Sequence, residues 1–238
     1  MANFTYKGQT IVMSLPNLSG NVRRKLDSGR FYEQKFLEYI ASLNVQGLYV
    51  DVGGNVGNHS IYFANFTLAQ SVISLEPHRE VFEFLKTNVK NNDPKQKVTL
   101  RNIAAGDKNG RCSLSEDVRD PLGGSFVTKG DDIEMQVLDD IVGDKKVSLI
   151  KIDVEGFEES VLMGAKKVLH RDQPELFIEA TTRAEKQTID STLKPYGYTS
   201  VNVYNNTATY HYSTTRKRNS LTYFITSPYL IRRFIRYS

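Results

Sequence analysis

From residue 48 onward, short apolar runs alternate with amphipathic segments, and this alternation constrains the fold more than any other feature of the sequence. The apolar runs predict strands, and the segments with apolar residues at helical spacing predict helices. Apolar strands that alternate with helices are typical of a mostly parallel sheet covered on both faces. Ligands of such sheets bind at the carboxyl ends of the strands. The expected strands are 48–52, 71–75, 97–103, 147–154 and 175–180, and the expected helices are 59–66, 81–89, 158–170 and 184–196.

Other segments depart from this rhythm. The first residues carry one short β pattern and one helical pattern. Residues 106–137 are rich in glycine and contain two β-like pieces, which predicts an inserted β-hairpin. The pattern between 199 and 225 predicts two antiparallel strands. The expected organisation is an N-terminal strand and helix segment (1–47), a main domain (48–226, with the insertion at about 106–137) and a basic amphipathic tail (227–238).

The composition excludes several classes of protein. Cys112 is the single cysteine of the 238 residues, so an intrachain disulfide framework and a cysteine-rich zinc site are both excluded. The sequence contains no apolar run of the length that a membrane-spanning helix needs. Residues 1–16 lack the basic start and apolar block of a signal peptide, so we expect a cytoplasmic protein.

The net charge of +4 is unevenly distributed. Residues 211–238 contain six of the 31 Lys and Arg residues and no acid, which leaves 25 cations against 27 acids in the rest of the chain. A nearly neutral body does not suit a nucleic-acid partner, and we expect none. Apolar residues alternate with arginines over 230–236, as on an amphipathic helix. This tail could contact the inner face of a membrane, or it could pack on the domain or on the second subunit of a homodimer.

A glycine-rich turn follows the first strand of the main domain. Its sequence, residues 51–59, is Asp-Val-Gly-Gly-Asn-Val-Gly-Asn-His, and Glu76 ends the next strand. A strand, a glycine turn, a helix, a second strand and an acid together are typical of nucleoside-cofactor sites, in which the acid binds the ribose hydroxyls. The G-x-G-x-x-G dinucleotide pattern fails because positions 55 and 58 are asparagines. Asp51 just before the turn favours a cationic ligand such as S-adenosylmethionine, while a tight turn without a ligand is the structural alternative.

The sequence resembles FkbM-family methyltransferases. The resemblance covers about residues 30–182 and rests on the glycine turn, on Leu-Glu-Pro at 75–77, on Ile-Lys-Ile-Asp-Val-Glu-Gly-Phe-Glu at 150–158, and on shorter matches at 102–107, 137–140 and 174–179. It implies a class I methyltransferase fold (a Rossmann-like, mostly parallel seven-stranded sheet), S-adenosylmethionine as methyl donor, and O-methylation of a sugar hydroxyl, as in polysaccharide biosynthesis. The acceptor would then be a sugar-containing small molecule or a glycan.

The resemblance also implies a set of cofactor-binding residues. Asp51, Gly53, Asn55 and Gly57 would surround the methionine part of the cofactor, and Glu76 would hold the ribose. The turn at 103–105 would lie along the adenine. His59 and Tyr32 are further candidates, although ordinary packing would explain both. The full expected set is Tyr32, Asp51, Gly53, Asn55, Gly57, His59, Glu76, Pro77, Asn102, Ala104, Ala105 and Asp153.

Carboxylates concentrate where two strands of the predicted sheet end. Asp153, Glu155 and Glu179 are the candidate catalytic residues, because a carboxylate at the end of a buried strand needs a reason. One of them could take the proton of the acceptor hydroxyl, or the three could bind Mg²⁺, and the sequence leaves both open. Glu158 is a candidate for the acceptor, although an acid in the first turn of a helix is also favoured by the helix dipole. Ser125 belongs to a loop of the insertion that we expect to close on the acceptor.

Two other functions compete with methyl transfer. A nicotinamide-dependent oxidoreductase would use the same kind of sheet, but Asp51 and the two missing glycines oppose it. A non-catalytic binding module is the second alternative. The presence of Asp51, Glu76, Asp153 and Glu155 together opposes it.

Overall fold

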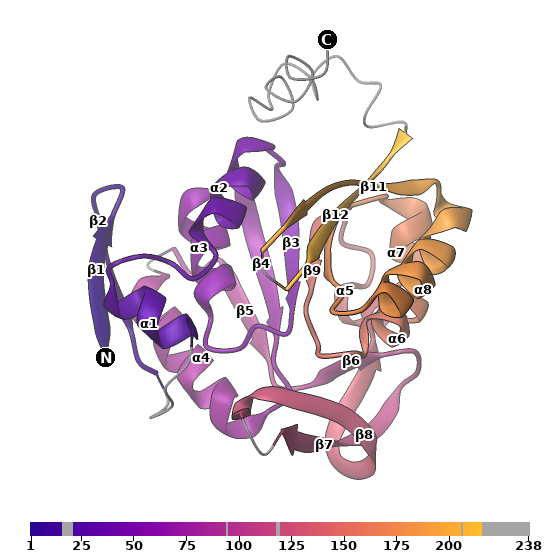
Figure 1. Ribbon diagram of the computed structural model, residues 1–238, viewed down its shortest axis with the longest axis horizontal. Coiled ribbons are helices and arrows are strands. Elements are labelled where there is room, and N and C mark those ends of the chain that lie inside the picture. Colours follow the sequence, from indigo (N-terminus) through magenta and orange to yellow (C-terminus); the bar gives the residue numbers. More distant parts are fainter. Residues whose placement is uncertain (16–20, 94, 118–119, 206, 216–238) are drawn as a thin grey trace.

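A computed structural model of the chain describes residues 1–15, 21–93, 95–117, 120–205 and 207–215. Its centre is a seven-stranded sheet in the order β11-β12-β10-β9-β3-β4-β5 (Figure 1). The pairs within β10-β9-β3-β4-β5 are parallel, and β12 and β11 add an antiparallel edge. The predicted mostly parallel sheet is therefore confirmed. The strands are β3 (Gly47–Val52), β4 (Ala69–Leu75), β5 (Val98–Arg101), β9 (Val147–Ile152), β10 (Glu175–Glu179), β11 (Tyr198–Tyr204) and β12 (Thr209–Thr214).

Alternate residues of each central strand bury against opposite helix layers. Val50, Ile150 and Leu176 belong to one apolar cluster, whereas their neighbours Tyr49 and Leu149 belong to the other. Burial on both faces explains the near-continuous apolar runs in these strands. The first layer contains α5 (Leu138–Val142), α6 (Glu158–Met163), α7 (Lys166–Arg171) and α8 (Arg183–Leu193), and a short 3-10 helix (Lys194–Tyr196) follows α8. The second layer contains α1 (Asn21–Asp27), α2 (Gln34–Ser42), α3 (Asn58–Phe66) and α4 (Arg79–Asn92).

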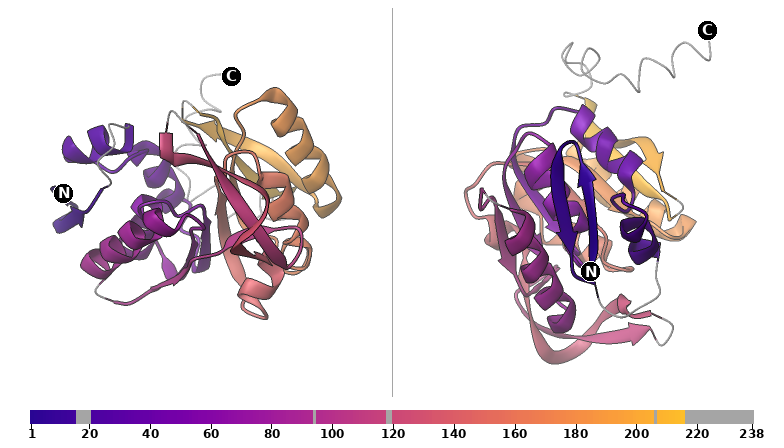
Figure 2. Two further views of the ribbon diagram at one scale, coloured as in Figure 1. Left: turned by 90° about the horizontal axis from the view of Figure 1, so that it is seen from below. Right: turned by 90° about the vertical axis from the view of Figure 1, so that its left-hand side faces the viewer.

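The N-terminal segment adds a hairpin outside the second layer. Strands β1 (Ala2–Tyr6) and β2 (Gln9–Met13) pair antiparallel, and Figure 2 shows them as the outermost elements on that side. Asn88 and Asn92 of α4 attach this hairpin, because their side chains bond both the N–H and the C=O groups of residues 12 and 14. Such paired amide bonds replace the sheet partner that β2 lacks on this side.

The sequence predicts one helix over 158–170, but the chain forms α6 and α7 with a break at Gly164. A Cβ atom on Gly164 would lie 1.9 Å from the carbonyl oxygen of Gly106, so only glycine allows this close approach. The Asp139 carboxylate then accepts hydrogen bonds from the N–H groups of Lys167 and Val168 at 2.9 and 3.0 Å. The second helix begins where this distant carboxylate satisfies its first N–H groups.

The insertion is a longer hairpin than the sequence predicts. Strands β7 (Gly110–Asp117) and β8 (Asp120–Val137) pair antiparallel, and β6 (Ala104–Gly106) pairs parallel with β8. Figure 1 shows this three-stranded sheet along one end of the central sheet. Residues 123–125, which we expected in a closing loop, belong to β8, so that expectation is corrected. The hairpin is continuous because β7 and β8 pair over most of their length, with register shifts at two places.

A buried polar network joins the antiparallel edge to the second helix layer. The His211 ring, which is fully buried, is hydrogen-bonded to the Tyr39 hydroxyl through Nδ1 and to Glu175 through Nε2, both at 2.8 Å. The ring of Phe177 stacks on His211 with centroids 4.5 Å apart. This network lies where β10 begins, at the opposite end from the candidate site.

Two expectations concern parts of the chain that the structure does not cover. The basic tail, 227–238, lies outside the described residues, and so does the side chain of Ser125. Among the described residues, no helix combines the length and the apolar character needed to cross a bilayer.

Candidate active site

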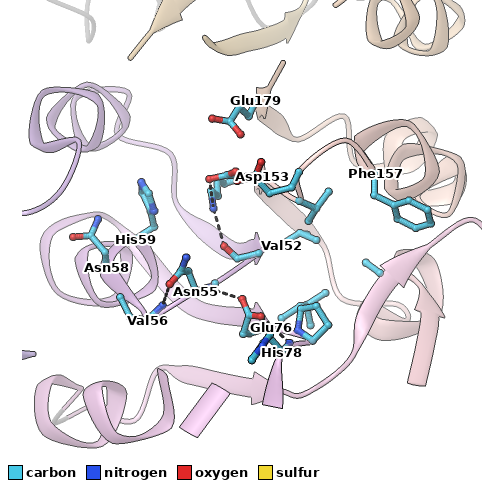
Figure 3. A pocket seen from close by; sticks show the side chains of 18 of the residues that line it. Val52, Asn55, Val56, Asn58, His59, Glu76, His78, Asp153, Phe157 and Glu179 are labelled. Carbon is cyan, nitrogen blue, oxygen red and sulfur yellow. Dashed lines mark hydrogen bonds and ion pairs between the residues drawn. The ribbon is translucent and has the colours of Figure 1, made fainter. Parts of the chain in front are cut away.

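A cavity with a volume of about 490 Å³ opens where the parallel strands end. Its walls come from the segments that follow β3, β4, β5, β9 and β10 (Figure 3). Leu114 and Val127 of the inserted hairpin close one side. This is the place where a parallel sheet of this kind binds its ligands. A volume of this size suits a nucleoside-sized molecule.

The glycine turn after β3 brings the backbone close to the cavity. Gly53 has a φ of 81°, and a Cβ atom there would lie 1.9 Å from the carbonyl oxygen of Asp153. The N–H groups of Gly53 and Gly54 both donate to the carbonyl oxygen of Leu75, at 3.0 and 2.8 Å. The turn therefore ties the ends of β3, β4 and β9 together, and a larger residue at position 53 would separate them.

Glu76 is a buried carboxylate on the cavity wall. Its two oxygens accept hydrogen bonds from the backbone N–H groups of Asn55 and His78, at 2.9 and 2.8 Å (Figure 3). Burial raises the pKa of Glu76 to about 7, although these two hydrogen bonds and Lys151 oppose the shift. Each oxygen retains a lone pair, so the carboxylate can accept two more donors. The vicinal hydroxyls of a ribose are donors with this spacing.

Lys151 is an ammonium group buried in the middle of the sheet. Its Nζ donates to the carbonyl oxygen of Gly53 at 2.9 Å and lies 3.4 Å from Asp51 and 3.2 Å from Asp153. Burial disfavours the charge, but the carboxylates of Asp153 and Asp51 outweigh it and hold the pKa of Lys151 above its ordinary value. The two acids therefore keep a permanent cation directly beneath the cavity.

A carboxylate cluster forms where β9 and β10 end. Asp153, Glu155 and Glu179 each place a carboxylate oxygen within 4.8 Å of the other two. Burial and the charge of Asp153 raise the pKa of Glu179. Burial also disfavours the charge of Asp153, but Lys151 and the hydrogen bond with Glu179 outweigh this and lower its pKa. The two carboxyl groups therefore have pKa values shifted in opposite directions, that of Asp153 downward and that of Glu179 upward.

The segment before α2 covers the cavity from the other side. Asn58 bonds both the N–H and the C=O group of Tyr32, at 3.0 Å each, which fixes Tyr32 to the first turn of α3. Glu33 has a left-handed φ of 55°, and its carboxylate pairs with the His59 ring at 3.1 Å. A left-handed non-glycine residue is strained, and such strain concentrates at functional sites.

A second cavity of about 350 Å³ adjoins the first. The two share Val127, Glu155, Phe157 and Thr181 on their walls. Of the three clustered carboxylates, Glu155 lines both cavities, whereas Asp153 and Glu179 line the first. Glu155 is therefore placed at the junction of the two spaces.

Most of the residues predicted from the sequence line the first cavity. They are Tyr32, Gly53, Asn55, His59, Glu76, Pro77, Ala104, Ala105, Asp153, Glu155 and Glu179. His59 and Phe157 lie on opposite sides of the cavity in Figure 3. The expected contact of each lining residue with a cofactor or an acceptor stays a prediction.

Among the described residues, four predicted ones do not line the first cavity, and their expected contacts with a ligand stay predictions. Asp51 is completely buried against Lys151 and Ser60. Gly57, with a φ of 93°, precedes the first residue of α3. The Asn102 amide donates to the carbonyl oxygens of Glu76 and Pro77. Glu158 is buried and accepts hydrogen bonds from the N–H groups of residues 154 and 156, so it closes its own turn.

Sequence reasoning missed several residues of the site. Lys151 could have been identified from the sequence, because a charged residue within an apolar strand needs a buried partner. Asn58 and Glu33 carried none, since their roles depend on contacts between segments that are 26 residues apart. Arg23 also lines the cavity, from a helix that the sequence did not predict.

The fold and the site together define the class of protein to which the chain belongs. A mostly parallel seven-stranded sheet, with a glycine turn after β3 and an acid at the end of β4, is the architecture of a Rossmann-like class I methyltransferase. Residues 51–200 match the Methyltransferase FkbM domain. The chain belongs to the FkbM methyltransferase family, whose methyl donor is S-adenosylmethionine.

Solved structures show the same fold. The methyltransferase FkbM from Methylobacillus flagellatus superposes with a TM-score of 0.53 at 22% identity, over 71% of this chain and 43% of that chain. The chain thus spans less than half of that relative. The precorrin-8w decarboxylase of Methanobacterium thermoautotrophicum has a TM-score of 0.50 at 13% identity, over 86% of this chain and 97% of that one. A putative rRNA-methylase from Clostridium thermocellum has a TM-score of 0.50 at 12% identity, over 75% of this chain and 91% of that chain. A search of curated proteins returned no match.

Proposed function

We propose that this protein transfers the methyl group of S-adenosylmethionine to a hydroxyl of a sugar, in a glycan, a glycolipid or a glycosylated metabolite, and that Glu155 is the general base. The observation that supports the proposal is the position of Glu155, which lines both the cofactor-sized cavity and the adjoining one. A base must lie where the acceptor meets the methyl group, and this junction is such a place.

The cavity residues fit the cofactor. The oxygens of Glu76 can accept the two ribose hydroxyls, and the turn at Gly53 leaves room for the ligand close to the backbone. The first cavity also contains apolar residues suited to the adenine, among them Leu75, Ile103 and Ala104. S-adenosylmethionine supplies an activated methyl group on a sulfonium centre.

The transfer is an in-line displacement at the methyl carbon. The acceptor oxygen forms a bond to this carbon while the bond from the carbon to sulfur breaks, and S-adenosylhomocysteine leaves. The hydroxyl proton passes to the Glu155 carboxylate. The charged pair of Lys151 and Asp153, with Glu179 beside it, fixes the electrostatic field under the reacting atoms before the acceptor arrives.

The charge of the site opposes polyanionic acceptors. Among the described residues, six carboxylates line the two cavities, against the two fixed cations Arg23 and Lys151. Nucleic acids bind through many Lys and Arg contacts with phosphates, and these walls do not provide them. A sugar acceptor without nucleic acid is therefore the favoured partner, and we place the reaction in the cytoplasm. The predicted membrane contact of residues 227–238 and a homodimer stay predictions.

Mg²⁺ is the alternative use of Asp153, Glu155 and Glu179, because oxygen ligands at this spacing suit it. Lys151 lies 3.2 Å from Asp153 and already supplies a positive charge, so we favour the base. Methyl transfer that persists in excess EDTA supports the base. Activity that is lost in EDTA and restored by Mg²⁺ supports the metal.

The role of Glu155 is tested by Glu155→Gln. With [¹³C-methyl]-S-adenosylmethionine and a panel of glycosides, the wild type is expected to produce a methyl ether on a sugar oxygen. In Glu155→Gln, kcat should fall by about 10²- to 10⁴-fold, while the affinity for the cofactor stays unchanged. Glu159→Gln removes an exposed acid that lines neither cavity and is the matched control. Undiminished turnover in Glu155→Gln would exclude Glu155 as the base.

A further inference from the structure

We propose that the second cavity binds one pyranose ring of the acceptor, with a face of the ring on Phe157 and a ring hydroxyl hydrogen-bonded to Glu185. This inference rests on the proposed function, because it assumes a sugar acceptor. The residues on the cavity wall are Val127, Glu155, Gly156, Phe157, Thr181 and Glu185. Four of these also line the first cavity, so a ring in the second cavity lies beside the place of methyl transfer.

The size of the second cavity suits one sugar ring. Its volume of about 350 Å³ is near the lower end of the range for small-molecule pockets, which begins at about 300 Å³. A cavity of this size accommodates a monosaccharide. The rest of a longer glycan would therefore lie outside it.

The phenyl ring of Phe157 is held in place by its neighbours. Phe157 and Val127 both pack against a small buried cluster that contains Ala104, Cys112 and Met135. A Cβ atom on Gly106 would lie 3.2 Å from Cε1 of Phe157, so the missing side chain at position 106 leaves room for the ring. Phe157 nevertheless lines both cavities, so part of its surface is open to a ligand.

A pyranose ring is complementary to such a wall. The C–H groups on one face of the ring form an apolar surface, and the negative face of an aromatic ring attracts their hydrogens. The hydroxyls lie around the edge of the sugar. A sugar that packs on Phe157 therefore directs hydroxyls toward the polar part of the wall, which includes Thr181 and Glu185.

Glu185 supplies an acceptor for one of these hydroxyls. Its Oε2 accepts hydrogen bonds from the N–H groups of Thr181 and Thr182, at 2.7 and 3.0 Å, and from the Thr181 hydroxyl at 2.6 Å. The bond from the Thr181 side chain, together with the backbone bonds, lowers the pKa of Glu185, although burial opposes this shift. All three bonds go to Oε2, so Oε1 can accept a further hydrogen bond. A hydrogen bond to a carboxylate is stronger than one between neutral groups.

The start of α8 fixes this carboxylate before any ligand binds. Glu185 and Thr182 form a capping box, in which the N–H group of Glu185 donates to the Thr182 hydroxyl at 3.1 Å. The position of the acceptor oxygen is thus set by the local structure of the helix end. An acceptor that is already in place reduces the entropy lost when the sugar binds.

The test measures binding of methyl glycosides to the full chain saturated with S-adenosylhomocysteine, by saturation-transfer NMR and calorimetry. The probes are the methyl glycosides of glucose, galactose and mannose, and the monodeoxy analogues of the one that binds most tightly. Glu185→Gln replaces one carboxylate oxygen by an amide nitrogen and keeps an acceptor for the Thr181 and Thr182 bonds, so the capping box is preserved. Phe157→Leu keeps an apolar side chain and removes the ring. Glu159→Gln removes an exposed acid that lines neither cavity and is the matched control.

In the wild type and in Glu159→Gln, saturation should be strongest on the hydrogens of one ring face. One monodeoxy analogue should bind about tenfold more weakly than its parent, because it lacks the hydroxyl that donates to Glu185. Glu185→Gln should weaken the parent about tenfold and remove most of the difference between the parent and that analogue. Phe157→Leu should weaken all probes about three- to tenfold and abolish the preference for one face.

Three results would overturn the inference. Glycosides that bind Phe157→Leu and Glu185→Gln as tightly as they bind Glu159→Gln show that the ring lies elsewhere, but leave the sugar acceptor intact. If every monodeoxy analogue keeps the same affinity ratio to its parent in the wild type and in Glu185→Gln, Glu185 does not recognise the acceptor. If S-adenosylhomocysteine binds and none of the glycosides does, the sugar acceptor itself is refuted, and this inference with it.

Discussion

Glu76 shows how the fold prepares a single residue for its ligand. Its carboxylate is buried, and two backbone N–H groups hold its oxygens in place on the cavity wall. Burial raises the pKa of Glu76 to about 7. Ribose hydroxyls would donate to the ionised carboxylate, so cofactor binding and loss of the proton favour each other.

The affinity for S-adenosylmethionine should therefore depend on pH. Because the cofactor favours the ionised form of Glu76, its dissociation constant should rise as the pH falls below about 7 and stay constant above this value. The expected slope is up to tenfold per pH unit, since one proton is linked to binding. Calorimetry between acidic and mildly alkaline pH measures it. Glu76→Gln should bind more weakly and lose the slope. Wild-type affinity that is flat or rises toward acid would contradict this role.

Lys151 is the residue whose removal should most destabilise the site. Lys151→Met leaves the carboxylates of Asp51 and Asp153 buried without their cation. The free energy of unfolding should fall by about 3–5 kcal/mol, as measured by chemical denaturation.

Lys86→Met is the control for this variant, because Lys86 pairs with Glu83 on an exposed helix surface. Its free energy of unfolding should change by less than about 1 kcal/mol. If the two variants lose the same stability, the buried cation does not compensate its acids as described.

At the scale of elements, a close backbone approach at Gly164 joins the first helix layer to the inserted sheet. Gly164 separates α6 from α7 and touches the backbone of Gly106, which is the last residue of β6. This contact connects the helix that follows the carboxylate cluster to the inserted sheet that walls both cavities.

Gly164→Ala should destabilise the protein by about 1–3 kcal/mol, because a methyl group at this position overlaps the Gly106 carbonyl. Gly110→Ala is the matched control, since a Cβ atom at Gly110 has nothing within 4 Å. Thermal or chemical unfolding compares the two. A Gly164→Ala protein as stable as the Gly110→Ala protein would show that α6 can move away from β6 at no cost.

The elements differ in how well the sequence predicts them, for physical reasons. The central strands were predictable because burial on both faces makes them continuously apolar. The break at Gly164 was not, since a glycine within a helical pattern gives no sign of a close approach by a residue 58 positions away in the sequence. The length of β8 was also missed, because its glycines and Pro121 are typical of loops.

On the scale of the whole molecule, the sheet brings together residues that the sequence only places in order. The carboxylates of Asp153, Glu155 and Glu179 were predicted as a group because parallel strands end at one edge of the sheet. Asp51 and Glu158 were predicted to contact ligands, but the internal contacts that both make were not predicted, because a polar residue at a strand end can equally face the interior and stabilise the turn. Only the three-dimensional arrangement distinguishes these two roles.

Calorimetric titration of the purified protein with S-adenosylmethionine and with NAD⁺ tests most directly whether the first cavity is a methyl-donor site organised by Glu76. The structure predicts binding of S-adenosylmethionine in the wild type and in Glu80→Ala, which removes an exposed acid nearby, and loss of this binding in Glu76→Ala. NAD⁺ should not bind, because the turn at Gly53–Gly57 lacks the dinucleotide glycines. Binding of NAD⁺ in preference to S-adenosylmethionine, or cofactor binding that survives in Glu76→Ala, would contradict this account of the site.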